Sequence, residues 1–155
     1  MALLTFKTLD DFKIMLGKSL PDGAWYSVTQ EMINDFASAT LDEQWIHINT
    51  KKAAESSPFG STVAHGFMSV SMLSKLLADI FSIESLTMGL NYGLNKVRFP
   101  HPIPVNSNLR LLSSVKDIAP MYPNGIKVTF ACTIEIEGVE KPACVAEFIV
   151  ALFEQ

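Results

Sequence analysis

A continuous apolar segment from Gly66 to about Phe81 constrains the fold more than any other feature of the sequence. Its apolar residues are Phe67, Met68, Val70, Met72, Leu73, Leu76, Leu77, Ile80 and Phe81. This spacing leaves little room for a polar face, so we predict a helix that is buried nearly all round. At roughly 16 residues the segment is too short to cross a bilayer. Something else must therefore wrap the helix.

The remaining sequence supplies strands for this wrapping. Strands are predicted over 87–99, 108–118 and 142–153, and a first strand over 25–28. The clearest strand is 126–137, where apolar and polar residues alternate with period two, as in a strand buried on one face. Consecutive strands with short links pair antiparallel. We therefore predict an α+β fold in which one antiparallel sheet curls around the buried helix.

Shorter elements fill the first half of the chain. Residues 8–16 are predicted to form a short helix, and Thr29 is a suitable N-cap for a helix over 30–39. A non-helical loop is expected over 40–49, after which Thr50 caps another short helix. We expect all of these elements to belong to one domain spanning the 155 residues.

Composition and charge exclude several function classes. The net charge is −4, with Arg98 and Arg110 as the only arginines and no run of basic residues, so nucleic-acid binding is not expected. No apolar segment reaches membrane-spanning length and the N-terminus does not resemble a leader. We therefore expect a cytoplasmic protein. Hydrophobic residues make up 48% of the chain, a slight surplus that favours a subunit interface.

The two cysteines, Cys132 and Cys144, have no metal-ligand spacing. A hairpin turning near Gly138 would place them roughly opposite each other. We interpret them as buried, reduced thiols.

The residues best suited to acid/base chemistry lie in the segment before the apolar helix. Asp42 and His47 lie five residues apart in the expected loop, and a carboxylate with an imidazole is a standard pair for moving protons near neutral pH. The spacing alone is also compatible with a turn-ending Asp42 and a packing His47.

Gly66 opens the apolar helix, where backbone N–H groups are free and the helix dipole is positive. These N–H groups could stabilise a thioester oxyanion, although Gly66 is equally compatible with tight packing. His65 is expected to hold the loop beside the substrate. A metal site formed by His47 and His65 is not favoured, because their spacing is not that of a metal motif.

Further polar residues complete the candidate site. Ser71 either bonds its own helix backbone or orients the catalytic carboxylate. The candidates for binding substrate phosphates and for flanking a groove are Lys51, Lys52, Tyr92, Asn95, Lys96 and Arg98. Each of the charged residues is also compatible with a solvated surface position.

The composite pattern D-x4-H, then A-x5-FG-x3-AHG, then an apolar helix containing serine, resembles the MaoC-like dehydratase family. This family includes the (R)-specific enoyl-CoA hydratases. The strings LDEQWIHINTKKAAESSPFGSTVAHGF and NYGLNKVRFPHPIPVNSNLR are especially similar to the branch related to nodulation protein N. The resemblance covers about residues 29–108, roughly half of the chain.

The resemblance implies a hot-dog fold and usually a homodimer whose two sheets join. It implies hydration of a trans-2-enoyl-CoA to the (R)-3-hydroxyacyl form without a cofactor. By this resemblance Asp42 and His47 match the catalytic pair that activates water, and Gly66 matches the glycine whose N–H binds the thioester oxygen. Ser71 matches a serine that helps to orient the aspartate in some members.

One departure leaves the substrate open. Many members carry Asn-Pro where this chain carries Gln44-Trp45, which alters the loop and the pocket wall, and so bears on acyl length more than on reaction type. A hot-dog thioesterase, a non-catalytic acyl-thioester-binding protein and a dehydratase acting on acyl carrier protein remain alternatives.

Overall fold

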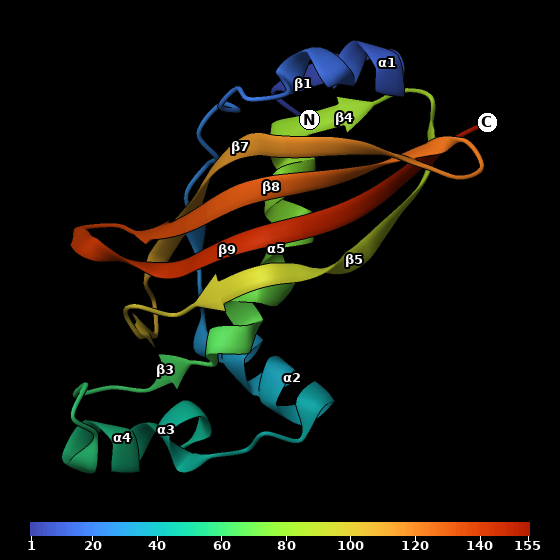
Figure 1. The fold of residues 1–155 in the computed structure, drawn as a ribbon. Coiled ribbons are helices and arrows are strands. Elements are labelled where there is room, and N and C mark those ends of the chain that lie inside the picture. The colour runs from blue at the N-terminus through green and yellow to red at the C-terminus, as the bar shows by residue number, and fades with distance from the viewer.

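A computed structural model describes residues 1–155, and its largest element is a five-stranded sheet (Figure 1). In spatial order the strands are β2 (Tyr26–Ser27), β7 (Asn108–Met121), β8 (Gly125–Ile136), β9 (Val139–Glu154) and β5 (Leu86–Arg98). Every neighbouring pair is antiparallel, which confirms the predicted α+β class. β5 forms one edge of this sheet.

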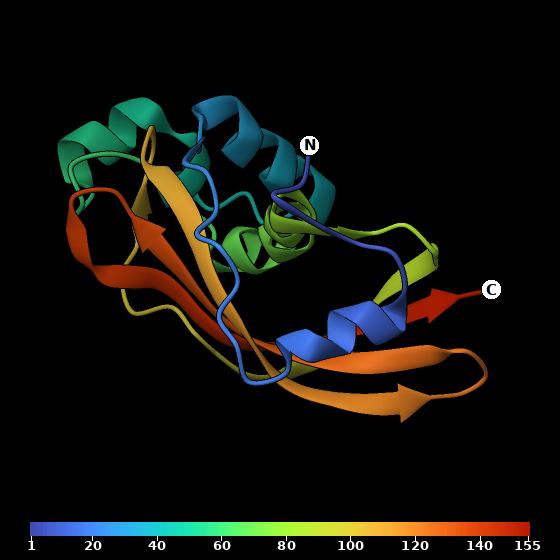
Figure 2. The same cartoon turned by 90° about the horizontal axis from the view of Figure 1, so that it is seen from above.

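Helix α5 (Gly66–Ile80) lies across the concave side of the curled sheet (Figures 1 and 2). Its residues Leu73, Leu76, Leu77 and Ile80 are buried in the main core. The alternating apolar residues of β8 face this core as predicted and are all buried: Ile126, Val128, Phe130, Cys132, Ile134 and Ile136. The helix and the sheet therefore bury each other's apolar faces, the dominant favourable contribution to folding.

The expectation that α5 is buried all round is wrong for one stripe of the helix. Phe67, Ser71, Ser74 and Ala78 are exposed, and the spacing of four, three and four residues puts them on one helical face. The sheet curls around the opposite side of the helix only. Phe67 keeps 66% of its surface exposed, and Ser74 donates to Asn91 of the edge strand β5, so the exposed stripe lies near that strand.

Short elements surround this core. They are β1 (Leu4–Phe6), α1 (Leu9–Phe12), a 3-10 turn (Lys13–Met15), α2 (Gln30–Thr40), α3 (Trp45–Ile48), α4 (Thr50–Ser56), β3 (Val63–Ala64), β4 (Phe81–Ile83) and β6 (Ile103–Pro104). β1 pairs parallel with β4, and β3 pairs antiparallel with β6. These four strands of two or three residues were not predicted.

One local expectation needs correction. The N-cap of α4 is Asn49, whose side chain accepts from the Lys52 backbone N–H at 2.9 Å, and not Thr50.

The cysteines are both free and buried, as expected. They lie on neighbouring strands, two residues away from direct opposition, because Cys132 pairs with Ala146 and Cys144 with Ile134.

Helices α2, α3 and α4 gather near the N-terminus of α5 (Figure 1). Thr29 caps α2 as predicted, accepting from the Met32 backbone N–H at 3.3 Å. None of the helices combines the length and apolar character that crossing a bilayer requires. The arrangement brings the ends of three helices to one place at the rim of the sheet.

The N-terminal helix is tied to the core by a buried aromatic ring. Phe12 is fully buried, and its ring lies 5.3 Å from that of Phe6, 4.8 Å from that of Phe81 and 6.4 Å from that of Phe130, centroid to centroid.

We predict that Phe12→Ala lowers the free energy of unfolding by about 3–5 kcal/mol, because it leaves a cavity among these rings. Tyr122→Ala is the matched control, since Tyr122 is 92% exposed, and it should change stability by less than about 0.5 kcal/mol. Denaturant unfolding measures both changes. Equal losses in the two variants would show that Phe12 does not anchor the helix.

Candidate active site

Asp42 follows directly on an unusual end of helix α2. The C-cap residue Leu41 has a φ of 60°, in the left-handed region, which is costly for a residue with a Cβ. Leu41 is also 83% exposed, so packing of its own side chain does not hold this conformation. The turn redirects the chain and brings Asp42 toward the start of α5.

His47 lies in the one-turn helix α3, which corrects the expectation of a wholly non-helical loop. The ring is buried, and its Nδ1 lies 2.6 Å from the carbonyl oxygen of Val63. Nδ1 must therefore carry the proton, and Nε2 keeps its lone pair. Burial is the main cause that lowers the pKa of His47. The nearby His65 lowers it further, while the Val63 carbonyl and Asp42 act in the opposite direction.

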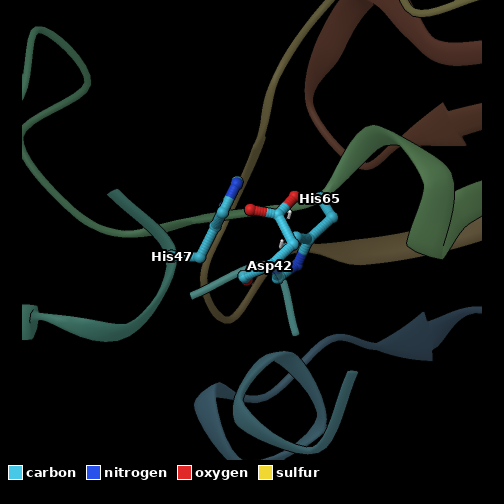
Figure 3. Close-up of side chains that lie close together, drawn as sticks. All are labelled: Asp42, His47 and His65. Atoms are coloured by element: carbon cyan, nitrogen blue, oxygen red, sulfur yellow. Dashed lines mark hydrogen bonds and ion pairs between the residues drawn. The ribbon is translucent and has the colours of Figure 1, made fainter. Parts of the chain in front are cut away.

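His65 immediately precedes α5 and is 3% exposed. Its Nε2 donates to the backbone carbonyl of Asp42 at 2.8 Å and lies 4.0 Å from the Asp42 carboxylate oxygen Oδ2. Its ring stacks on that of His47 with centroids 3.7 Å apart and an interplanar angle of 25°. Figure 3 shows the three side chains close together, contributed by three separate segments.

Gly66 begins α5, so its backbone N–H has no partner within the helix. A Cβ at this position would lie 2.9 Å from the ring of Phe99, which leaves no room for a side chain. The Ser69 hydroxyl donates to the Gly66 carbonyl at 2.6 Å. The structure therefore supports the packing role of Gly66, and its place at the start of α5 leaves its N–H free for a ligand.

These residues line a cavity of about 420 Å³. Its walls are formed by Phe36, Thr40, Asp42, His47, His65, Gly66, Phe67 and Ser71. The predicted pair Asp42 and His47 and the predicted glycine thus meet in one pocket. Ser71 also lines it, but its hydroxyl donates to the carbonyl of Phe67 at 2.9 Å. The alternative in which Ser71 bonds its own helix is the one that the structure shows.

The structure does not bring Tyr92, Asn95, Lys96 and Arg98 to this pocket. Tyr92 stacks under the Lys127 ammonium at 5.3 Å. Asn95 donates to the Glu147 carboxylate at 3.4 Å.

Lys96 pairs with Glu147 and Arg98 with Val145 along β9. Residues directly opposite in a sheet point to the same face, and the neighbouring Phe148 is in the core. All four predicted residues therefore lie on the outer face of the sheet, away from α5. They do not line the Asp42 pocket, and their role in substrate binding stays a prediction.

Several pocket residues were not predicted as such. Phe36 and Thr40 were not among the candidate site residues, and Phe67 was expected only as a buried apolar residue of the long helix. The role of the Val63 carbonyl is invisible in a sequence, because any residue has one. The contact of Phe99 with Gly66 could be found only from the three-dimensional packing.

The Asp42, His47 and His65 cluster places one ligand-type atom of each residue within 4.8 Å of the others. The geometry does not favour metal binding. The rings of His47 and His65 are nearly parallel and stacked, so their in-plane lone pairs do not converge on one point. The Nε2 atom of His65 donates to the Asp42 carbonyl, and only its Nδ1 remains as an acceptor. The arrangement is better suited to moving protons.

A sheet curled around a central helix, with this pocket at the start of that helix, is the hot-dog fold, and comparison with known proteins supports it. The model of the MaoC like domain matches residues 11–135. The R-hydratase PhaJ1 of Pseudomonas aeruginosa, in its unliganded form, aligns with a TM-score of 0.72 and 19% identity over 90% of this chain and 83% of its own.

Closer sequence relatives cover almost the whole chain. The 3-hydroxyacyl-thioester dehydratase Z of Mycobacterium tuberculosis is 42% identical over 146 residues, which is 94% of this chain and 96% of that protein. Nodulation protein N of Rhizobium leguminosarum bv. viciae is 38% identical over 143 residues, 92% of this chain and 89% of that protein. The chain belongs to the MaoC-like dehydratase family, and it is a hydro-lyase of the hydratase and dehydratase class.

Because the native state favours neutral His47, the unfolded chain binds more protons below the ordinary histidine pKa of 6.5. We predict that the free energy of unfolding is unaffected by His47 above pH 6.5. Below pH 6.5 it falls as the pH drops through the lower native pKa of His47.

Unfolding in denaturant at a series of pH values checks this prediction. His47→Asn is the matched variant, since its amide can still donate to Val63 but cannot titrate. The variant should show a flatter profile just below pH 6.5. Identical pH slopes in the two proteins would contradict the assignment.

Proposed function

We propose that the protein adds water to a trans-2-enoyl-CoA and forms the (R)-3-hydroxyacyl-CoA, with Asp42 and His47 as the acid/base pair. The observation that carries the proposal is the meeting of three groups in one pocket: the Asp42 carboxylate, the His47 imidazole and the helix-starting Gly66. The dehydratase and R-hydratase relatives support the same reaction class.

The protonation states suggest how the water is held. Neutral His47 presents the lone pair of Nε2, because Nδ1 donates to Val63. The Asp42 carboxylate is also an acceptor. A water molecule that donates to both is held with its oxygen lone pair toward C3 of the substrate. As the oxygen attacks C3, one of the two acceptors takes a proton, and the pair returns a proton to C2.

The thioester carbonyl is proposed to accept from the Gly66 N–H. Negative charge builds on this oxygen during the attack, and the first turn of α5 offers an unpaired donor and the positive end of the helix dipole. The enoyl thioester is already electrophilic at C3, so the proposed reaction needs no cofactor.

A second cavity is proposed to hold the acyl chain. About 220 Å³ in volume, it lies between the second half of α5 and strands β5, β8 and β9. Apolar side chains such as Leu77, Phe130 and Phe148 form most of its wall. The exposed stripe of α5 connects the two cavities, since Ser71 lines one and Ser74 lines the other.

The distance along α5 determines how long an acyl chain must be to reach the end of this cavity. Gly66 and Ala78 are twelve residues apart, a rise of about 18 Å at 1.5 Å per residue. With carbon–carbon bonds of about 1.5 Å, an acyl chain must have on the order of ten carbons to fill it.

A homodimer paired along β5 is also proposed. β5 is an edge strand of 13 residues, and such an edge presents unpaired backbone N–H and C=O groups. A second copy aligned there would pair these groups and cover the exposed stripe of α5.

The first test follows loss of enoyl absorbance with crotonyl-CoA and with a longer trans-2-enoyl-CoA. We predict that Asp42→Asn lowers kcat by about 10²–10⁴-fold without loss of stability, because the Asp42 side chain is 48% exposed. Asp35→Asn on α2 changes an exposed carboxylate outside the pocket and should leave kcat unchanged. Wild-type kcat in Asp42→Asn would contradict the proposal, and release of free thiol from saturated acyl-CoA would indicate a thioesterase.

We further predict that Ala78→Phe, which fills the second cavity, lowers kcat/KM for the longer enoyl-CoA by about tenfold or more and leaves crotonyl-CoA unaffected. Lys75→Phe places the same ring on α5 outside the lining of that cavity and serves as the control. Equal effects of Ala78→Phe on both substrates would show that the acyl chain lies elsewhere.

A further inference from the structure

We propose that His65 is a positioning residue that sets the geometry between Asp42 and His47, a role that rests on the hydratase function proposed above. It acts through one hydrogen bond and one ring contact. His65 Nε2 donates to the Asp42 backbone carbonyl at 2.8 Å, and its ring stacks on His47 at 3.7 Å. One buried side chain therefore touches both members of the proposed catalytic pair.

The hydrogen bond from His65 to the Asp42 carbonyl lies next to Leu41, whose backbone is in the left-handed region. Leu41 holds a φ of 60° with its side chain 83% exposed, and such a conformation persists only where surrounding structure enforces it. The donor of His65 acts on the very next residue, at the carbonyl of Asp42. We infer that this bond keeps the turn in place and the Asp42 carboxylate in the pocket.

The same short segment also fixes His47 and the oxyanion donor. The carbonyl of Val63 accepts from His47 Nδ1 at 2.6 Å, His65 holds Asp42, and Gly66 provides the first N–H of α5. Three residues of the segment 63–66 thus organise all three groups of the proposed reaction. A displacement of this segment would move the three groups relative to one another, and misplacements of about 1 Å are costly in catalysis.

The buried Nδ1 atom of His65 distinguishes a positioning role from a role in packing alone. Nδ1 of His65 is buried and has no hydrogen-bond partner, and the ring also packs 5.0 Å from that of Phe36. If the side chain served only to fill space, phenylalanine would fill it without leaving a buried acceptor unpaired. A histidine is needed here only if the Nε2–H donor is used.

The test compares His65→Phe with His65→Gln. His65→Phe keeps an aromatic ring but has no donor, so it should fold and lose roughly 10- to 100-fold in kcat, with KM within about threefold. His65→Gln retains a donor and should recover part of this loss. His101→Phe, a histidine that does not line the Asp42 pocket, should keep wild-type kcat.

The outcomes separate this proposal from the hydratase proposal. Wild-type kcat in a folded His65→Phe variant, or no recovery in His65→Gln, overturns the positioning role while leaving hydratase activity intact. Nitrogen-15 NMR of the histidine rings gives a readout without substrate. We expect His65 protonated at Nε2 and bare at Nδ1, and the opposite tautomer overturns the proposal even if the wild-type protein turns over neither enoyl substrate.

Discussion

The burial of α5 against the concave side of the sheet determines where the rest of the structure can lie. Leu73, Leu76, Leu77 and Ile80 point into a core shared with β8 and β9, and this apolar contact supplies most of the driving force for the fold. It also fixes the helix N-terminus at the rim of the sheet. There the unpaired N–H groups of the first turn meet the ends of α2 and α3, so the same packing that builds the core also creates the polar pocket.

The pocket buries its two imidazole rings and leaves its carboxylate partly exposed to solvent. His47 and His65 are buried and stacked, and a proton added to His47 would be opposed both by burial and by the neighbouring ring. The Asp42 carboxylate is 48% exposed. A neutral imidazole and an exposed carboxylate, both acceptors, suit the proposed role of holding and deprotonating water. The backbone carbonyls of Val63 and Asp42 set the ring tautomers.

Periodicity predicted the framework well, because a strand or helix that packs on one core must repeat its apolar residues. The alternation in β8 and the apolar run of α5 each gave the correct element within one or two residues. The same reasoning overstated the burial of α5, since sequence does not show that the sheet covers only one side. The two- and three-residue strands have no period to detect, and the single turn of α3 is too short to show one.

The site was predicted where it depends on side-chain chemistry and missed where it depends on packing. The family motif placed Asp42, His47 and Gly66, which share one pocket. Tyr92, Asn95, Lys96 and Arg98 were proposed for their chemistry alone, and the register of β5 with β9 turns them to the outer face. The strained Leu41 and the Val63 carbonyl act through the backbone, for which residue identity carries almost no signal.

The proposed addition of water across the double bond of an enoyl thioester leaves the added oxygen at C3 of an intact product. Incubation of the protein with a trans-2-enoyl-CoA in water enriched in oxygen-18, followed by mass spectrometry and chiral analysis of the product, follows that oxygen. We expect an intact (R)-3-hydroxyacyl-CoA that carries the heavy oxygen at C3. Heavy oxygen in the carboxylate of a released acid, together with free CoA, would contradict it and show that the pocket hydrolyses the thioester.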